Sequence, residues 1–479
     1  MPFDSLLFWI FLAAVWLLWL ISPSALYRRV VLAAAGFVFY YLAQPTFVVL
    51  LLMVTVFTYL VGTGIQRAAL PQMRQRLLWL GVGGSVLCLA IFKYAGMMGR
   101  AGIRLAEIIP GLQNDAAQFI LPLGISYYIF QAIGYLVDCY RRQAPEKVGF
   151  LDYALFLSFF PHITAGPILR SADFLPQLRA RARLSLQMAA PVLWESLLLI
   201  TFGLFKKMVI ADNLAGYVNE VFSNLASASS PQILLATYAY AAQIYCDFSG
   251  YTDVALGAAL LFGLRLPANF RWPYLANSAA DFWNRWHISL SHWLRDYVYF
   301  SLPGLRSGSP FAPYRNLLIT MALCGLWHGA GWTFFLWGLY HGALLAAYRA
   351  GQPLWRRLKA LPDWLHNLCA IIFVQQLVVA GWVLFRIEKV GDLRVYIGGL
   401  FNLDSLGGAI SALSSDKKMV AGMLLLFWLG QFLHQSYPLT DYMKARPWNP
   451  WAMSLLLLLG LAIVTFKQSI AVPFLYFKF

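Results

Sequence analysis

The sequence has few charged residues. Asp, Glu, Lys and Arg make up 12% of the chain, about half of the roughly 25% found in soluble globular proteins. Hydrophobic residues make up 60%, more than a soluble fold of this length can hide from water. The composition therefore excludes an ordinary soluble protein and predicts that the bilayer is the solvent.

Paired cysteines and the common catalytic signatures are missing as well. The five cysteines show no paired spacing, so neither a disulfide framework nor a cysteine metal site is expected. The chain has no G-x-S-x-G, no H-E-x-x-H and no phosphate-binding glycine loop. His287 and His292, like His328 and His341, have spacings that fall on different helix faces, so no metal site is predicted. General-base catalysis by histidine in a buried channel remains.

Basic residues are in excess, with 36 Lys and Arg against 20 Asp and Glu. They are scattered between apolar runs, which disfavours a nucleic-acid-binding surface. Such an excess is typical of loops that face the cytoplasm and anionic lipid.

Long apolar runs indicate an all-α polytopic membrane protein. A spanning helix needs about 20 mostly apolar residues, and we expect about eleven such helices, with re-entrant and interfacial helices besides. Val30–Gln66 is long enough for two helices, with a break at Gln44-Pro45. The charge-free runs are Ser5–Tyr27, Val30–Gln66, Ala116–Val137, Val221–Cys246, Asn316–Tyr348, Trp364–Phe385, Met419–Thr440 and Pro447–Phe466; Leu77–Phe92 is shorter, and Tyr153–Ala172 and Met188–Ile210 are interrupted.

Helix-breaking residues inside these runs predict re-entrant segments, because irregular backbone at membrane depth survives only where protein or a cavity covers it. These residues are Pro122, Gly124, Pro161, Gly166 and Pro167. No linker or repeat divides the chain, so residues 1–479 are expected to form one membrane domain.

The short loops predict the orientation. Ser5–Tyr27 follows Asp4 and lacks a basic flank, so it is expected to be the first membrane helix and not a signal peptide. Arg28-Arg29 and the Arg67–Arg76 loop flank one hairpin, and their charge places that side in the cytoplasm and the N-terminus in the periplasm. The Arg141–Lys147 loop agrees, whereas Arg170–Arg183 fits only if the preceding segment does not fully cross.

Histidine is scarce, with seven in the chain, and polar groups inside a membrane are expensive. His328 lies near the middle of the run Asn316–Tyr348, beside Trp327. Gly325, Gly329 and Gly331 surround it and would allow another helix or a ligand to approach. Two interpretations stay open, a core histidine satisfied by its neighbours and a functional group.

Asp281–Asp296 is expected to form one amphipathic helix, interfacial or re-entrant, anchored by tryptophans. At helical period an apolar stripe holds Phe282, Trp286, Leu290, Trp293 and Tyr297. One polar stripe holds Asn284, His287, Ser291 and Arg295; a second holds Arg285, Ser289, His292 and Asp296. His287 either belongs to a membrane anchor or points into a cavity.

A third polar cluster, Gln243–Asp253, ends an apolar run. Gln243, Asp247 and Gly250 share a helix face, and Asp253 continues it. The two carboxylates form a proton or ion site, or they are structural partners of basic residues elsewhere; the residues alone favour structural pairing.

Taken together, these motifs resemble the membrane-bound O-acyltransferase family, in the bacterial branch of the alginate O-acetyltransferase membrane subunit and the D-alanyl-lipoteichoic acid transferase. The similarity covers most of the chain from about residue 90. The matching segments are Leu121–Tyr128, Tyr135–Asp138, Phe160–Ile168, Gln243–Asp253, Pro267–Pro273, Asp281–Tyr297, Leu323–Gly342 and the tail Phe474–Phe479. Asn284 stands where many members have a basic residue, and His162 occupies a variable place.

The resemblance implies a ring of helices around a through-membrane tunnel. His328 would be the catalytic histidine and His287 the second functional one. Acetyl-CoA would be the donor, held near Arg285 or Arg295, with no tightly bound cofactor. The acceptor would be a periplasmic or membrane-anchored partner transferase that modifies an extracytoplasmic polysaccharide at the inner membrane.

Other functions remain open. A secondary transporter would share the spans but usually shows an internal repeat. A non-catalytic subunit of a polysaccharide secretion complex would tolerate loss of both histidines. D-alanyl transfer from a carrier protein would need a docking surface for that protein.

Overall fold

The fold is known from a computed structural model. It describes residues 2–22, 24–95, 121–164, 166–180, 189–305, 307–355, 362–402, 415–436, 439–468 and 472–475. Every regular element in these ranges is a helix, which confirms the all-α prediction.

The chain forms two compact units. Unit 1 comprises residues 1–200 and 251–267, and unit 2 comprises residues 201–250 and 268–479. Helices α9 (Ala189–Leu204) and α11 (Ser230–Leu261) contribute residues to both units. The single membrane domain over residues 1–479 stays a prediction, as does the through-membrane tunnel.

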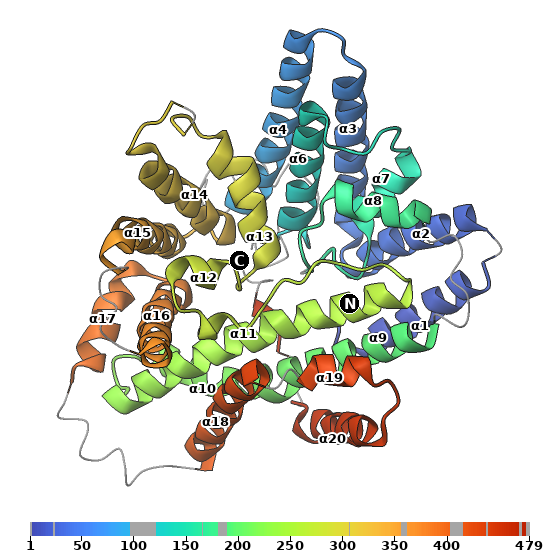
Figure 1. Cartoon of the computed structure of the whole chain (residues 1–479). Coiled ribbons are helices and arrows are strands. Elements are labelled where there is room, and N and C mark those ends of the chain that lie inside the picture. The colour runs from blue at the N-terminus through green and yellow to red at the C-terminus, as the bar shows by residue number, and fades with distance from the viewer. Residues whose placement is uncertain are drawn as a thin grey trace. The chain divides into compact units, whose positions relative to one another are not determined.

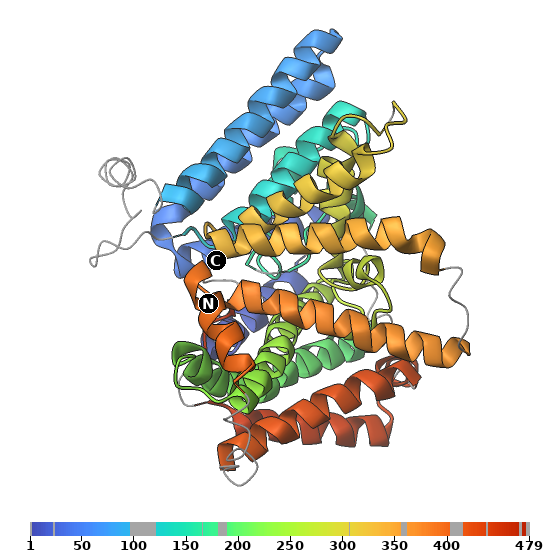
Figure 2. The same cartoon turned by 90° about the vertical axis from the view of Figure 1, so that its left-hand side faces the viewer.

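Unit 1 is built from seven further helices among its described residues. They are α1 (Leu6–Leu20), α2 (Ala25–Ala43), α3 (Val48–Arg67), α4 (Pro71–Tyr94), α6 (Ile125–Arg141), α7 (Phe150–Ser158) and α8 (Ser171–Ala180). Both views show α3 and α4 side by side as an antiparallel hairpin (Figures 1 and 2).

Four helices in the described ranges are long and apolar enough to cross a membrane: α2, α3 with its preceding 3-10 turn, α4 and α16 (Asp363–Arg386). Large apolar side chains are exposed on them, for example Leu60 (61%) and Trp79 (64%). A row of exposed apolar side chains fits lipid and not water. The count of eleven spans is not confirmed.

The break predicted at Gln44-Pro45 is confirmed. Helix α2 ends at Ala43, Pro45–Phe47 form a 3-10 turn, and α3 begins at Val48. The Gln44 side chain ties this turn down, because its Oε1 accepts from the Leu123 N–H at 2.6 Å.

The basic segments of unit 1 gather at one end of its helices. Arg29 pairs with Asp152 at 2.8 Å, Gln66 donates to the Pro145 carbonyl, and Arg74 donates to the Tyr140 carbonyl. Arg28-Arg29, Arg67–Arg76 and Arg141–Lys147 therefore share a side. That this side is the cytoplasm stays a prediction.

Helix α7 is short, with nine residues, or about 14 Å at 1.5 Å per residue. That is less than half the roughly 30 Å hydrocarbon core, as a re-entrant segment requires. Gly124, before α6, has φ +67°, and a Cβ there would lie 2.1 Å from the Ile163 carbonyl oxygen. Only glycine allows this left-handed residue to touch the loop after α7.

Unit 2 contains the remaining helices. They are α10 (Asp212–Ser223), α12 (Ala279–Trp283), α13 (Ile288–Trp293), α14 (Ala312–His328), α15 (Trp332–Trp355), α16 (Asp363–Arg386), α17 (Val390–Leu400), α18 (Ser415–Ser436), α19 (Leu439–Ala445) and α20 (Pro450–Phe466), with π-helices at Phe205–Ala211 and Leu294–Val298. Helices α15 and α16 pack against each other, and Figure 2 shows them side by side.

Three predicted runs are wrong in their bounds. Ser5–Tyr27 is not one helix, because the chain turns after Leu20 and α2 begins at Ala25. Val221–Cys246 is broken between α10 and α11. Asn316–Tyr348 is a hairpin of α14 and α15 and not one span. Hydropathy alone does not register a turn made of uncharged residues.

Glycines bring the two helices of this hairpin into contact. A Cβ at Gly325 would lie 2.2 Å from the Phe334 carbonyl oxygen, and one at Gly338 would lie 2.2 Å from that of Met321. The close approach expected around His328 is therefore confirmed for Gly325. Gly331 differs, since its nearest contacts are at an ordinary 3.6 Å.

Other segments fall near their predictions, some with parts outside the described residues. Leu77–Phe92 extends to Pro71–Tyr94, while α16, α18 and α20 correspond to the last three runs. Of Ala116–Val137, residues 116–120 lie outside the described residues, and so do residues 181–183 of Arg170–Arg183 and residues 476–479 of the tail.

Candidate functional site

The structure brings the two predicted histidines together around one tryptophan of unit 2. The Trp327 ring lies 6.0 Å from the His287 ring and 4.7 Å from the His328 ring, measured between centroids. All three side chains are buried. Residues 40 positions apart in the chain thus form one cluster, because α14 returns past the α12–α13 connection.

His287 occupies a strained position. It separates α12 from α13 and has φ 42° and ψ 53°, the left-handed region that non-glycine residues rarely adopt. Such strain costs on the order of 1 kcal/mol and collects at functional sites. Helices of five and six residues are too short to cross a membrane.

The single amphipathic helix expected over Asp281–Asp296 is therefore wrong. The residues of its apolar stripe are buried within the protein, and the turn at His287 breaks the helical period after α12. The polar stripe does not form: His287 is fully buried, Ser291 is half-buried, and Asn284 and Arg295 are exposed.

Asn269 holds the His287 ring. Its side-chain Oδ1 lies 3.1 Å from His287 Nδ1, 3.2 Å from the Ser289 N–H and 2.8 Å from Ser289 Oγ. Its own carbonyl accepts the Ile288 N–H at 2.9 Å. One buried residue thus clamps both sides of the strained turn.

These contacts fix the tautomer of the ring. The Ser289 N–H can only donate, so the Asn269 atom that receives it is the oxygen. That oxygen requires a proton on His287 Nδ1, which leaves Nε2 with its lone pair in the neutral ring. Burial lowers the pKa of His287 to about 3, so the ring is a neutral base at physiological pH.

His328 is the last residue of α14, at the turn into α15. Its ring lies 5.0 Å from Trp337 and 5.1 Å from Phe385. It is thus at the end of a helix, and the expected place in the middle of a spanning run is wrong. The aromatic surroundings give the ring a defined orientation in an apolar wall.

The other histidines have different surroundings. His341 is buried between Trp283 (5.3 Å) and Trp337 (4.9 Å), as a core residue of the aromatic cluster. His292 is half-buried in α13. His162 belongs to unit 1, where it is buried against Gln131 at 2.6 Å.

The two predicted donor-binding arginines have neighbouring carboxylates as partners. Arg285 pairs with Asp281 at 2.8 Å, and Arg295 pairs with Asp296 at 2.7 Å. Both are at least partly exposed. Contact with acetyl-CoA at either one stays a prediction.

Asp247 is paired with a basic residue, as the sequence of the Gln243–Asp253 cluster favoured. Lys207, on the π-helix after α9, lies 2.7 Å from both Asp247 and Asp212, and all three are buried. Gly250 lies on the same face, since a Cβ there would be 3.0 Å from the Lys207 backbone nitrogen. Gln243 is buried, and Asp253 lies further along α11, half-buried.

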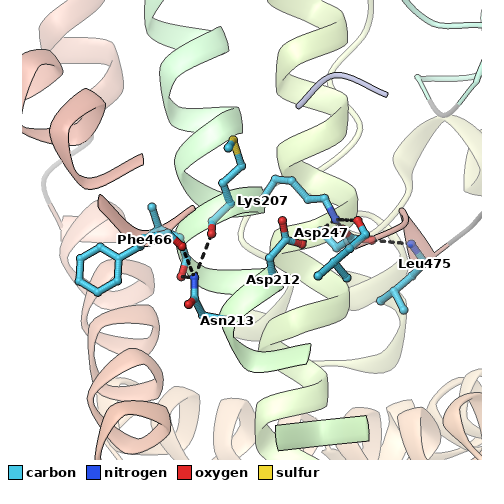
Figure 3. Close-up of polar contacts among 9 residues, drawn as sticks. Lys207, Asp212, Asn213, Asp247, Phe466 and Leu475 are labelled. Atoms are coloured by element: carbon cyan, nitrogen blue, oxygen red, sulfur yellow. Dashed lines mark hydrogen bonds and ion pairs between the residues drawn. The ribbon is translucent and has the colours of Figure 1, made fainter. Parts of the chain in front are cut away.

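The same ion group binds the C-terminal segment. The Lys207 ammonium donates to the Val472 carbonyl at 3.0 Å, and Asp247 Oδ2 accepts the Leu475 N–H at 2.8 Å (Figure 3). Phe474, between them in sequence, contacts Phe248 at 5.9 Å, and Phe248 contacts His287 at 4.7 Å. The tail thereby supports the wall of the histidine site.

Sequence reasoning missed Asn269 and Lys207. Asn269 lies in Pro267–Pro273, which was matched to the family without a role for any residue in it. Lys206 and Lys207 interrupt an apolar run, and a charge within an apolar run of a membrane protein is itself a signal for a partner.

Comparisons with known proteins identify the family of the chain. The family model described as "MBOAT, membrane-bound O-acyltransferase family" matches residues 34–383. The probable alginate O-acetylase AlgI of Azotobacter vinelandii is 39% identical over 93% of this chain and 88% of its own length. The peptidoglycan O-acetyltransferase of Helicobacter pylori is 33% identical over 80% of this chain and 76% of its own.

A less similar relative is named for a different polymer. The teichoic acid D-alanyltransferase of Bacillus subtilis is 30% identical over 55% of this chain and 68% of its own length. With the matched residues covering both histidines and most of the chain, the protein belongs to the membrane-bound O-acyltransferase family.

Proposed function

We propose that this O-acyltransferase moves acetyl groups from cytoplasmic acetyl-CoA across the inner membrane for O-acetylation of an extracytoplasmic polysaccharide. The names of two kinds of relative, a probable alginate O-acetylase and a peptidoglycan O-acetyltransferase, support acetyl transfer to a glycan.

The observation that carries the proposal is the pair of buried histidines whose rings both contact Trp327, one of them with a fixed tautomer. A thioester is already activated, so the enzyme supplies mainly position and a base. His328 takes the proton of the acceptor hydroxyl as its oxygen attacks the thioester carbonyl. The C–O bond forms, the C–S bond breaks, and the proton passes to the departing sulfur.

His287 is the second base or holds the donor through Nε2. Trp327, which contacts both rings, gives the acyl chain an apolar surface. Arg285 and Arg295, with Asn284 and Ser291 nearby in sequence, are assigned to the mouth that receives the coenzyme phosphates. Each arginine would exchange its present carboxylate for a phosphate there.

The immediate acceptor in this proposal is a hydroxyl on a periplasmic or membrane-anchored partner transferase, which then modifies the polymer. The N-terminus faces the periplasm, and the shared end of Arg28-Arg29, Arg67–Arg76 and Arg141–Lys147 faces the cytoplasm. Clustering of these basic segments supports the orientation.

Histidine variants test the assignment. His328→Ala and His287→Ala should each lose acetylation by about 10²–10⁴-fold, the usual loss for a general base. His292→Ala, in the adjacent helix and half-buried, is the matched control and should keep most activity. Acetyl content of the polymer is measured in a complemented deletion strain, with membrane protein level as the reference. Near-normal acetylation by His328→Ala would favour a non-catalytic subunit.

The donor is tested separately. Purified protein with radiolabelled acetyl-CoA should label its partner transferase or the glycan. If label came only from an aminoacyl carrier protein, D-alanyl transfer would replace the acetyl proposal.

A further inference from the structure

Arg28 lines a small cavity of unit 1 at the α1–α2 turn. The cavity has a volume of about 30 Å³, and a buried water needs roughly 10–15 Å³ by the same measure. It therefore holds about two oxygen-sized groups. Residues from four elements surround it: α1, α2, α8 and the segment after α11. The lining includes Trp19, Arg28, Arg29, Leu32, Leu178 and Phe262.

The Arg28 guanidinium lacks an anionic partner among the described residues. Its Nε and Nη1 are buried, and their N–H groups find no hydrogen-bond acceptor there. Trp19 covers one face of the guanidinium, with Cζ 4.7 Å above the ring. A cation–π contact orients the group but leaves its N–H donors unused. Buried donors without acceptors are rare and costly.

The neighbouring charges do not compensate Arg28. Arg29 is itself paired with Asp152 at 2.8 Å, and none of the described residues that line the cavity is Asp or Glu. Gln177 is the remaining polar residue of the lining, and its side-chain amide already has backbone partners. It donates to the Asp173 and Arg265 carbonyls and accepts the Arg265 N–H. One positive charge is left over, and water in the cavity would satisfy the donors without neutralising it.

From this geometry we propose that the cavity binds the phosphate of an anionic phospholipid headgroup. A phosphodiester presents two non-ester oxygens, as many as the cavity holds, and a guanidinium is the preferred phosphate partner. Arg28 lies in the first turn of α2, a candidate membrane span, where the interface begins. Exposed Leu26 (57%) and Val30 (46%) on the same turn offer acyl chains an apolar surface.

The inference concerns a site separate from the histidines and does not depend on the acyl donor or acceptor. Soluble phosphates carry the same chemistry, so the experiment distinguishes them. Delipidated full-length protein in detergent is titrated with phosphatidylglycerol, phosphatidylcholine, inorganic phosphate or coenzyme A, and binding is followed by native mass spectrometry and by the unfolding temperature.

Phosphatidylglycerol should bind and raise the unfolding temperature of the wild type more than phosphatidylcholine does. Arg28→Gln should need an at least about tenfold higher concentration, as expected from loss of charge-assisted hydrogen bonds. Arg67→Gln is the matched control. Arg67 is exposed and lies at the same end of unit 1, and the substitution removes one positive charge, as Arg28→Gln does. It should bind like the wild type.

Equal stabilisation of the wild type by both lipids would overturn the proposal even if Arg28→Gln failed to fold. Stabilisation by inorganic phosphate or coenzyme A but not by phosphatidylglycerol would also overturn it, as would equal losses in Arg28→Gln and Arg67→Gln.

Discussion

Asn269 is a positioning residue for the His287 ring, and its replacement gives a sharp test of the site. In Asn269→Ala, three donors lose their common acceptor: His287 Nδ1, the Ser289 N–H and the Ser289 hydroxyl. Each buried unmet donor costs about 1–3 kcal/mol. The Asn269 carbonyl still receives the Ile288 N–H, so the turn keeps one anchor and the variant should fold with lowered stability.

The effect on catalysis should be larger than the effect on folding. Without the acceptor at Nδ1 the ring is free to carry its proton on Nε2, where it is no longer a base. Removing the residue that orients a catalytic histidine costs up to about 10⁴-fold in other enzymes. We expect kcat to fall about 10²–10⁴-fold, which is roughly 3–5 kcal/mol of barrier. Asn269→Ala combined with His287→Ala should be no slower than His287→Ala alone.

Asn269→Asp is the variant to compare with Asn269→Ala, because it keeps an oxygen acceptor for His287 Nδ1 and adds a negative charge. A carboxylate raises the pKa of the adjacent imidazole, and only the neutral ring, present above that pKa, is a base. Activity should therefore recover at high pH and be lost as pH falls through the raised pKa. The measurement is acetyl transfer to the partner in detergent, per folded protein, across pH. Wild-type rates in Asn269→Ala, or an unshifted pH profile in an active Asn269→Asp, would refute the reasoning.

Three further outcomes follow from the contacts. Lys207→Met leaves Asp247 and Asp212 buried together and should cost about 3–5 kcal/mol, seen as lower membrane levels and a lower unfolding temperature than an exposed-lysine control, Lys389→Met. Gly338→Val should open the α14–α15 hairpin, because even a Cβ would lie 2.2 Å from a carbonyl oxygen, and should abolish activity together with stability. Single cysteines placed in the Arg67–Arg76 or Arg141–Lys147 segments of a cysteine-free background should resist impermeant thiol reagents in spheroplasts; ready labelling would reverse the orientation.

Part of this architecture was predictable because local sequence determines it. Pro45 after Gln44 cannot continue a helix, so the α2–α3 break could be placed to the residue. The short α7 was also foreshadowed by Pro161 and Gly166, which interrupt its apolar run.

The histidine site was only half predictable. Its two histidines came from the family resemblance, whereas helical periodicity placed His287 on a stripe with Asn284 and Ser291. Periodicity assumes continuous helical dihedrals, and the positive φ of His287 is imposed by Asn269, a long-range partner. The turn after His328 was hidden for a related reason, since Gly329 and Gly331 change direction without changing hydropathy.

The hydrogen bond between Asp247 and the Leu475 backbone has a consequence for biogenesis. Its partners are 228 residues apart, and helices enter the membrane in order of synthesis. Until Val472–Leu475 are synthesised, Lys207 lacks the Val472 carbonyl and Asp247 lacks the Leu475 N–H as hydrogen-bond partners. Phe248 also lacks its contact with Phe474. Completion of the His287 wall is thereby deferred until Val472–Leu475 have been synthesised, so a nascent chain that stalls before residue 472 leaves Lys207 and Asp247 without these backbone partners.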